Sequence, residues 1–111
     1  MDNSQFEQLF ESLKTATESL AKTSFQDYVG QAKKDGEAAL DTMKADLQRW
    51  AEEVETGVLT KEDLSFLLLE EGALGEMRAL KNAGLAEVQI DKFKNGLVTM
   101  IISTLTGLIR V

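Results

Sequence analysis

The sequence contains no cysteine, no histidine and no proline among its 111 residues. Without cysteine there is neither a disulfide framework nor a thiolate nucleophile. Without histidine the chain lacks the most common catalytic base and a frequent metal ligand. The absence of proline removes the strongest helix breaker. These absences favour long helices and weigh against an enzyme, so we expect no catalytic residue, no metal and no cofactor.

The residues that are abundant also favour helices. Leu, Ala, Glu, Lys and Gln lose little side-chain freedom in a helix, and they are frequent here. The hydrophobic fraction of 43% and the charged fraction of 28% are typical of a folded protein. We therefore predict an all-α protein in which residues 1–111 form a single helical domain, either a helical bundle or a coiled coil.

The net charge of −7 is unevenly distributed along the chain. Residues 1–56 hold 12 acids and 6 bases, whereas residues 57–111 hold 7 acids and 6 bases. The only adjacent basic pair is Lys33 and Lys34. Nucleic acids and anionic membrane surfaces both attract clustered basic residues, so neither is an expected partner. The first residues lack the basic stretch and apolar run of a signal peptide, which predicts a cytoplasmic protein.

The first half of the chain carries one amphipathic stripe. Its apolar residues recur at helical spacing and predict one long helix over about 4–56, started by a capping box of Ser4 and Glu7. The stripe drifts by about 100° along this length, as in packing with a period above 3.6 residues. The alternative is a helix broken near Gly30–Gly36, with Asp35 capping the second piece.

The next segment begins with a clear turn. Gly57 is placed to end a helix in the left-handed conformation. Thr60 and Asp63 then have the spacing of a capping box, which predicts a second helix over about 61–83. Two glycines within residues 72–75 are positioned to kink or break this helix.

A third helix is predicted over about 87–109. Gly84 suits the end of the preceding helix in a Schellman motif, with Leu80 and Leu85 placed to make the accompanying hydrophobic contact. Both later helices are shorter than the first and are expected to pack back against it.

The last predicted helix is apolar over more than half of its circumference. Its large side chains fill an arc of roughly 200°, where a surface helix needs a stripe of about 100°. Small residues fill the rest of the circumference, and small residues spaced four apart allow two helices to approach closely. These small residues are Gly96, Thr99, Ser103, Thr106 and Gly107.

Three environments would cover such a helix: a bundle or dimer core, a membrane, or a groove on another protein. The apolar run is shorter than the ~20 residues that a membrane span requires. A bundle core is therefore favoured, and a homodimer would complete the bundle if the first helix is continuous. If the first helix is broken, four helices of about 20 residues could close a monomeric bundle. The residues predicted to mediate self-association are Phe93, Leu97, Met100, Ile101, Ser103, Leu105, Gly107 and Leu108.

No motif in the sequence points to chemistry. Carboxylates such as Glu7 and Glu11 lie four apart, which is typical of a solvated helix face. Phe66 and Leu69 broaden the apolar arc of the second predicted helix and add a weaker indication of an interface. The favoured hypothesis is a non-enzymatic helical scaffold or adaptor that self-associates and binds a protein partner. The alternative is a carrier that encloses a small apolar ligand or lipid within its bundle.

Overall fold

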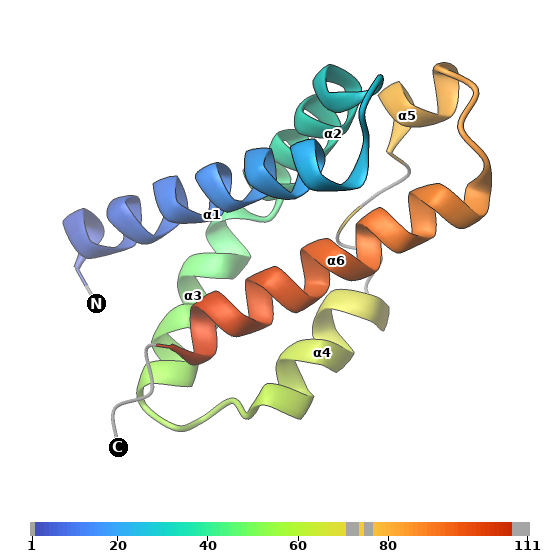
Figure 1. The fold of residues 1–111 in the computed structure, drawn as a ribbon. Coiled ribbons are helices and arrows are strands. Elements are labelled where there is room, and N and C mark those ends of the chain that lie inside the picture. Colours follow the sequence, from blue (N-terminus) through green and yellow to red (C-terminus); the bar gives the residue numbers. More distant parts are fainter. Residues whose placement is uncertain (1, 71–73, 75–76, 108–111) are drawn as a thin grey trace.

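The described part of the chain folds into six helices joined by loops, and it has no β-strand. The computed structural model describes residues 2–70, 74 and 77–107. The prediction of an all-α protein is confirmed (Figure 1). The helices are α1 (Asn3–Ser24), α2 (Val29–Thr42), α3 (Lys44–Glu55), α4 (Lys61–Glu70), α5 (Arg78–Asn82) and α6 (Glu87–Thr106).

The prediction of a continuous helix over 4–56 is wrong, because the chain leaves the helical conformation after Ser24. Phe25 is extended, and the loop up to Tyr28 turns the chain so that α2 packs back against α1. The ring of Phe25 packs edge-on against Phe93 of α6, with centroids 5.5 Å apart. The break therefore lies before Gly30–Gly36, a run that is helical and belongs to α2.

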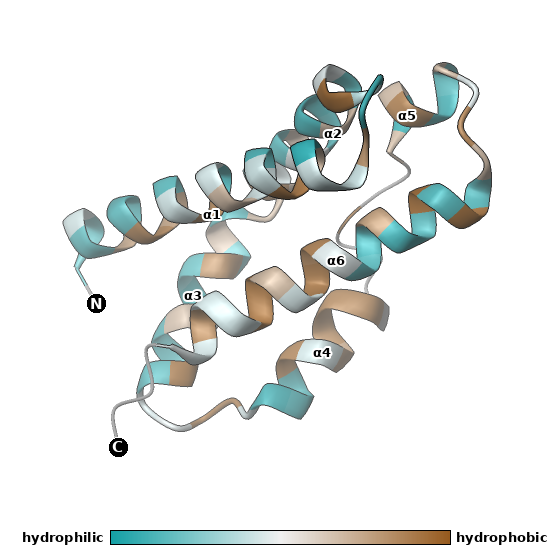
Figure 2. Ribbon diagram, viewed as in Figure 1, coloured by the Kyte–Doolittle hydropathy of each residue, from teal (hydrophilic) through white to brown (hydrophobic). Residues whose placement is uncertain are grey.

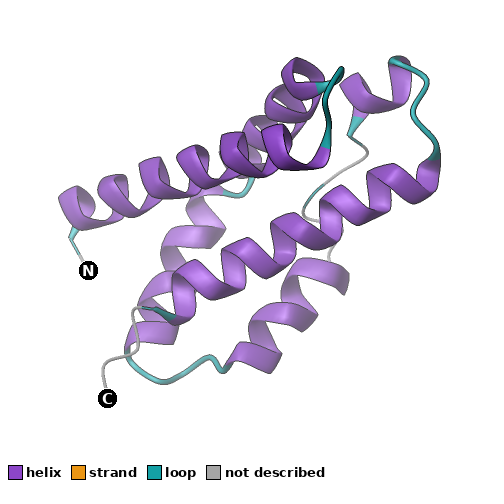
Figure 3. Cartoon of the chain, in the orientation of Figure 1, coloured by secondary structure: helices purple, strands orange, loops and turns teal. Residues whose placement is uncertain are grey.

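A second change of direction occurs at Met43, between α2 and α3. Its backbone N–H bonds to Ala39, and its carbonyl accepts from Leu47. The hydrogen bonding thus continues through the bend, which lets α3 run away from α1 (Figure 3). An unbroken helix over 4–56 would be on the order of 80 Å long, whereas the longest dimension of the molecule is 42 Å.

Two predicted helix caps differ in the structure. Asp2 caps α1 instead of Ser4: its carboxylate accepts the Gln5 backbone N–H at 2.8 Å, and the Gln5 side chain accepts the Asp2 N–H. This arrangement is also a capping box, shifted by two residues from the predicted one. Asp35 caps no helix piece of its own, because it lies inside α2.

The turn between α3 and α4 is the one that the sequence predicts. Gly57 has a φ of +83°, and the amides of Gly57 and Val58 bond back to Val54 and Glu53, as in a Schellman motif. Thr60 and Asp63 form the reciprocal capping box at distances of 3.0 and 3.1 Å.

The second Schellman motif is confirmed as well. Gly84 has a φ of +91°, its amide bonds to Lys81, and the Leu85 amide bonds to Leu80. The helix predicted over 61–83 is present as α4 and α5, and the glycines at 72 and 75 lie outside the described residues.

Helix α6 is the central element of the bundle. It packs against α1, α3, α4 and α5 (Figure 1), and the hydrophobic colour is concentrated in its second half (Figure 2). Its aliphatic arc is buried by the chain's own helices, which is possible because the N-terminal half is divided into three pieces. The buried residues of α6 are Ile90, Phe93, Leu97, Val98, Ile101, Ile102 and Leu105.

Helices α1 and α2 approach each other closely at Gly36. A Cβ atom added there would collide with the Cγ2 atom of Thr17, which is fully buried in α1. The Thr17 hydroxyl donates to the Leu13 carbonyl at 2.8 Å, so this polar group is satisfied within its own helix. The glycine at 36 therefore sets the distance between the two helices.

Candidate functional site on the α4–α6 surface

Half of the residues predicted to mediate self-association lie in the interior. Phe93, Leu97, Ile101 and Leu105 are almost completely buried, and Met100 is half-buried against the same core. Their large side chains are already covered by the other helices. As the chain is folded, these four are not surface residues, whereas the sequence pattern predicts that they contact a second copy.

The small-residue side of α6 is the side that remains accessible. Thr99, Ser103 and Gly107 are exposed. At the other end of this side, Gly96 is partly covered, because an added Cβ would lie 3.2 Å from a methyl carbon of Leu20 in α1. Of the predicted self-association residues, Ser103 and Gly107 therefore lie at the surface, while Leu108 lies outside the described residues.

Helix α4 carries two exposed apolar side chains. Phe66 is 64% exposed and Leu69 is 56% exposed, although both are large hydrophobic residues. Lys61, Ser65 and Leu69 are spaced four apart and so lie along one side of α4. Because Lys61 borders a hollow that α6 also lines, this side of α4 adjoins α6.

That hollow has a volume of about 390 Å³ and lies where α4 begins and α6 ends. Its walls are formed by hydroxyl side chains and one isoleucine of α6 together with one lysine of α4. The Thr106 hydroxyl donates to the Ile102 carbonyl at 2.7 Å, so it is occupied within the helix. The residues that line the hollow are Lys61, Thr99, Ile102, Ser103 and Thr106.

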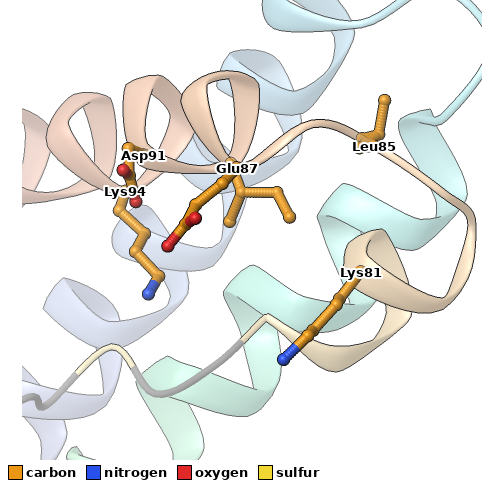
Figure 4. A pocket seen from close by; sticks show the side chains of 6 residues that line it. Lys81, Leu85, Glu87, Asp91 and Lys94 are labelled. Atoms are coloured by element: carbon orange, nitrogen blue, oxygen red, sulfur yellow. The ribbon is translucent and has the colours of Figure 1, made fainter.

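A second hollow, of about 320 Å³, lies between α5 and the first turns of α6 (Figure 4). Lys81 from α5 and Lys94 from α6 both line it; Glu87 lies between these two lysines, and Asp91 lies next to Lys94 (Figure 4). Sequence reasoning missed this hollow, since its charges lie on two helices that only the tertiary structure brings together. Its lining residues are Lys81, Leu85, Glu87, Ile90, Asp91 and Lys94.

Three ion pairs among the described residues join α1 to α2 or α3. Lys14 pairs with Asp41 at 3.2 Å, and the hydrogen bond to this carboxylate raises the pKa of Lys14 above its ordinary value. Lys44 pairs with Glu7 at 3.0 Å and lies over the Phe10 ring. Glu7 is therefore part of an ion pair between helices.

The described acidic residues form no metal-type cluster, and the described buried polar groups are satisfied. Within the described ranges, no cluster of three or more acidic residues is arranged to hold a metal ion. In the same part of the chain, each buried side-chain nitrogen or oxygen has a hydrogen-bond partner. Buried polar atoms that are already satisfied stabilise a fold and leave no free group aimed at a ligand.

No protein-family model, no curated protein and no solved structure matches this chain. None of the helices in the described part combines the length and the apolar character that crossing a bilayer requires.

Proposed function

We propose that this protein is a non-enzymatic helical scaffold of the cytoplasm that forms a homodimer and binds a protein partner. The contact between the two copies is the surface formed by α4 and the small-residue side of α6. The observation that carries this proposal is the exposure of Phe66 and Leu69 on α4. This surface replaces the aliphatic side of α6, which the bundle itself covers.

Two properties of this surface support self-association. Burying a large hydrophobic side chain contributes about 1.5–3 kcal/mol, so leaving Phe66 and Leu69 in water forgoes considerable stabilisation. Leu69 lies in line with Lys61 and Ser65 along α4, and Lys61 also lines the hollow beside Thr99 and Ser103. A two-fold dimer uses one patch twice, so exposed apolar side chains on a helix that borders a hollow suit such an interface.

Charge is compatible with the same arrangement. The first turn of α4 carries Glu62 and Asp63, and the hollow has Lys61 in its wall. Two copies related by a two-fold axis would bring the acids of one α4 towards the lysine of the other. Such pairs at the edge of an interface favour the correct orientation more than they add affinity.

The test is sedimentation velocity over a concentration series, with the double variant Phe66→Ser/Leu69→Ser. The wild-type chain is expected to sediment as a dimer at micromolar concentration. Losing the burial of even one of these side chains should weaken dimerisation by about tenfold or more. Val88→Ser is the matched control, because Val88 is equally exposed at 66% but lies at the opposite end of α6 from the hollow.

A monomeric mass for the wild-type chain at micromolar concentration would overturn the proposal. An equal effect of Val88→Ser and of the double variant would place the contact elsewhere. The far-ultraviolet circular dichroism of each variant checks that the helices are intact, since surface substitutions normally change stability little.

The apolar-ligand carrier has no comparable support. Both hollows described above open to the surface, and each has charged or hydroxyl side chains in its wall. Sites for apolar ligands are usually concave and lined mainly by apolar side chains.

A further inference from the structure

Asp35 is a buried acidic residue whose side chain joins two helices that are distant in the sequence. It lies inside α2 and is only 8% exposed. One carboxylate oxygen accepts the backbone N–H of Ala79 at 2.9 Å, and the other accepts the N–H of Leu80 at 2.8 Å. Both donors belong to the first turn of α5, whose amides have no partner within that helix. Asp35 thus acts as the N-terminal cap of a helix more than forty residues away.

Helix α5 has little stability of its own. It has five residues, far fewer than the ~12–15 that an isolated helix needs in water. The residue that precedes α5 is Met77, and its φ of 53° is a left-handed conformation that residues other than glycine rarely adopt. Met77 makes no side-chain cap. What keeps α5 folded must therefore come from its contacts with the rest of the molecule.

Those contacts are concentrated on one side. Helix α5 packs mainly against α2 and to a smaller extent against α6, and it lies at one end of the molecule (Figure 1). Leu80 is fully buried and Met77 nearly so. The contacts of α1 with α6 and of α4 with α6 do not involve α5. The bundle can therefore keep most of its packing when α5 is displaced.

We propose that α5 is a clasp, which opens and closes as a unit while the helices around α6 stay folded, and that Asp35 sets how often it opens. Proteins open locally in such cooperative units, with free energies well below that of global unfolding. Opening exposes the side chains of Met77 and Leu80, and it uncovers the side of α2 on which they rest. The clasp is thus a conformational device that presents a new apolar surface at the α5 end, separate from the α4–α6 surface.

Hydrogen exchange followed by mass spectrometry on the full chain tests this device. In the wild type, the amides of residues 79–83 are expected to exchange faster than those of the middle of α6. Low denaturant should leave their rate nearly unchanged, because a local opening exposes little surface. The proposal would be overturned if the amides of α5 and α6 exchanged at equal rates and with equal dependence on denaturant. This measurement uses the wild-type chain alone.

Asp35→Asn identifies the residue that holds the clasp. The amide side chain keeps one acceptor, but its NH₂ group faces the second backbone N–H. Loss of a hydrogen bond to a charged acceptor should raise the exchange of residues 79–83 by about 10- to 100-fold. Exchange in the middle of α1 and α6 should stay as in the wild type.

The matched control is Asp41→Asn, the same change on an exposed acid of the same helix. It should leave the exchange of residues 79–83 unaltered. If Asp35→Asn accelerates α1, α5 and α6 equally, α5 does not open independently and the clasp does not exist. If the variant leaves α5 unchanged, Asp35 does not set its opening.

Discussion

Two glycines of α2 allow the close approach of α1 and α2 to be tested with the same substitution at two positions. At Gly36 an added Cβ collides with the Thr17 Cγ2 atom, whereas at Gly30 no atom lies within 4 Å. Alanine is favoured over glycine inside a helix by about 1 kcal/mol, and by less at Gly30, which is the second residue of α2. Helix propensity thus favours alanine at both positions, so a loss of stability at Gly36 alone reports the contact between the helices.

The size of the effect at Gly36 follows from how little Thr17 can move. Thr17 is fully buried, it is β-branched, and its hydroxyl is bonded to the Leu13 carbonyl. Overpacking a core costs about 1–3 kcal/mol, which exceeds the gain in helix propensity. We therefore expect Gly36→Ala to lower the free energy of unfolding by about 1 kcal/mol. Gly30→Ala should raise it by about 0.5–1 kcal/mol.

The measurement is urea and thermal unfolding followed by circular dichroism. An unchanged dependence on urea would show that the midpoint shifts reflect stability alone. For a chain of this size, 1 kcal/mol corresponds to a melting-temperature shift of about 4 °C or more. The two variants should therefore move the midpoint in opposite directions.

A double variant shows whether the Thr17 methyl is the cause. Thr17→Ser removes the colliding Cγ2 atom but keeps the hydroxyl that bonds to Leu13. Combined with Gly36→Ala, it should recover most of the lost stability, because the alanine methyl occupies the vacated space. The coupling between the two changes should be about 1 kcal/mol. The reasoning is refuted if Gly36→Ala is as stable as the wild type, or if the two effects are simply additive.

Two further predictions test the surface of α6 and a turn. Ser103→Leu should preserve folding, since Ser103 is exposed, but it should disrupt the proposed dimer and so lower the mean mass measured by light scattering. Glu18→Lys, which breaks only exposed ion pairs with Lys22 and Lys33, should leave both folding and mass nearly unchanged. An unaltered mass for Ser103→Leu would show that this part of α6 is not in the proposed dimer contact. Gly84→Ala should destabilise the chain by about 1 kcal/mol in thermal unfolding, because alanine is strained at a φ of +91°. An unchanged melting temperature would show that the turn adapts to alanine.

Local signals in the sequence predicted the helix ends that depend on neighbouring residues alone. The Thr60–Asp63 capping box and the left-handed Gly57 and Gly84 belong to this group. Each is decided within about six residues, because its hydrogen bonds connect groups that are close along the chain. The cap of α1 was displaced by two residues, since Asp2 and Gln5 form the same motif as the predicted pair.

The breaks in the first half of the chain could not be derived in this way. Gly30 and Gly36 are weak helix formers, yet both are helical, while the chain turns at Phe25. What favours this turn is the packing of Phe25 on Phe93, nearly seventy residues further along. Helix propensity is a weak preference that tertiary contacts override.

Part of the candidate site could likewise be predicted from the sequence, and part of it could not. The exposed pair Phe66 and Leu69 was visible in the sequence as a broadening of one apolar arc. The aliphatic side of α6 was also visible, but whether its own chain or a second copy covers it depended on where the first helix breaks. The hollow beside α5 forms only where α5 and α6 come together, so neither segment of the sequence contains a pattern that predicts it.

By itself, the sequence determined an all-helical chain, the turns at Gly57 and Gly84 and the apolar character of α6, because composition, periodicity and caps act over short distances. Only the tertiary structure decided that α6 is enclosed by its own chain, that its small-residue side stays exposed, and that Asp35 caps α5. Each of these depends on contacts between residues tens of positions apart, whose energies exceed the local preferences that a sequence reveals.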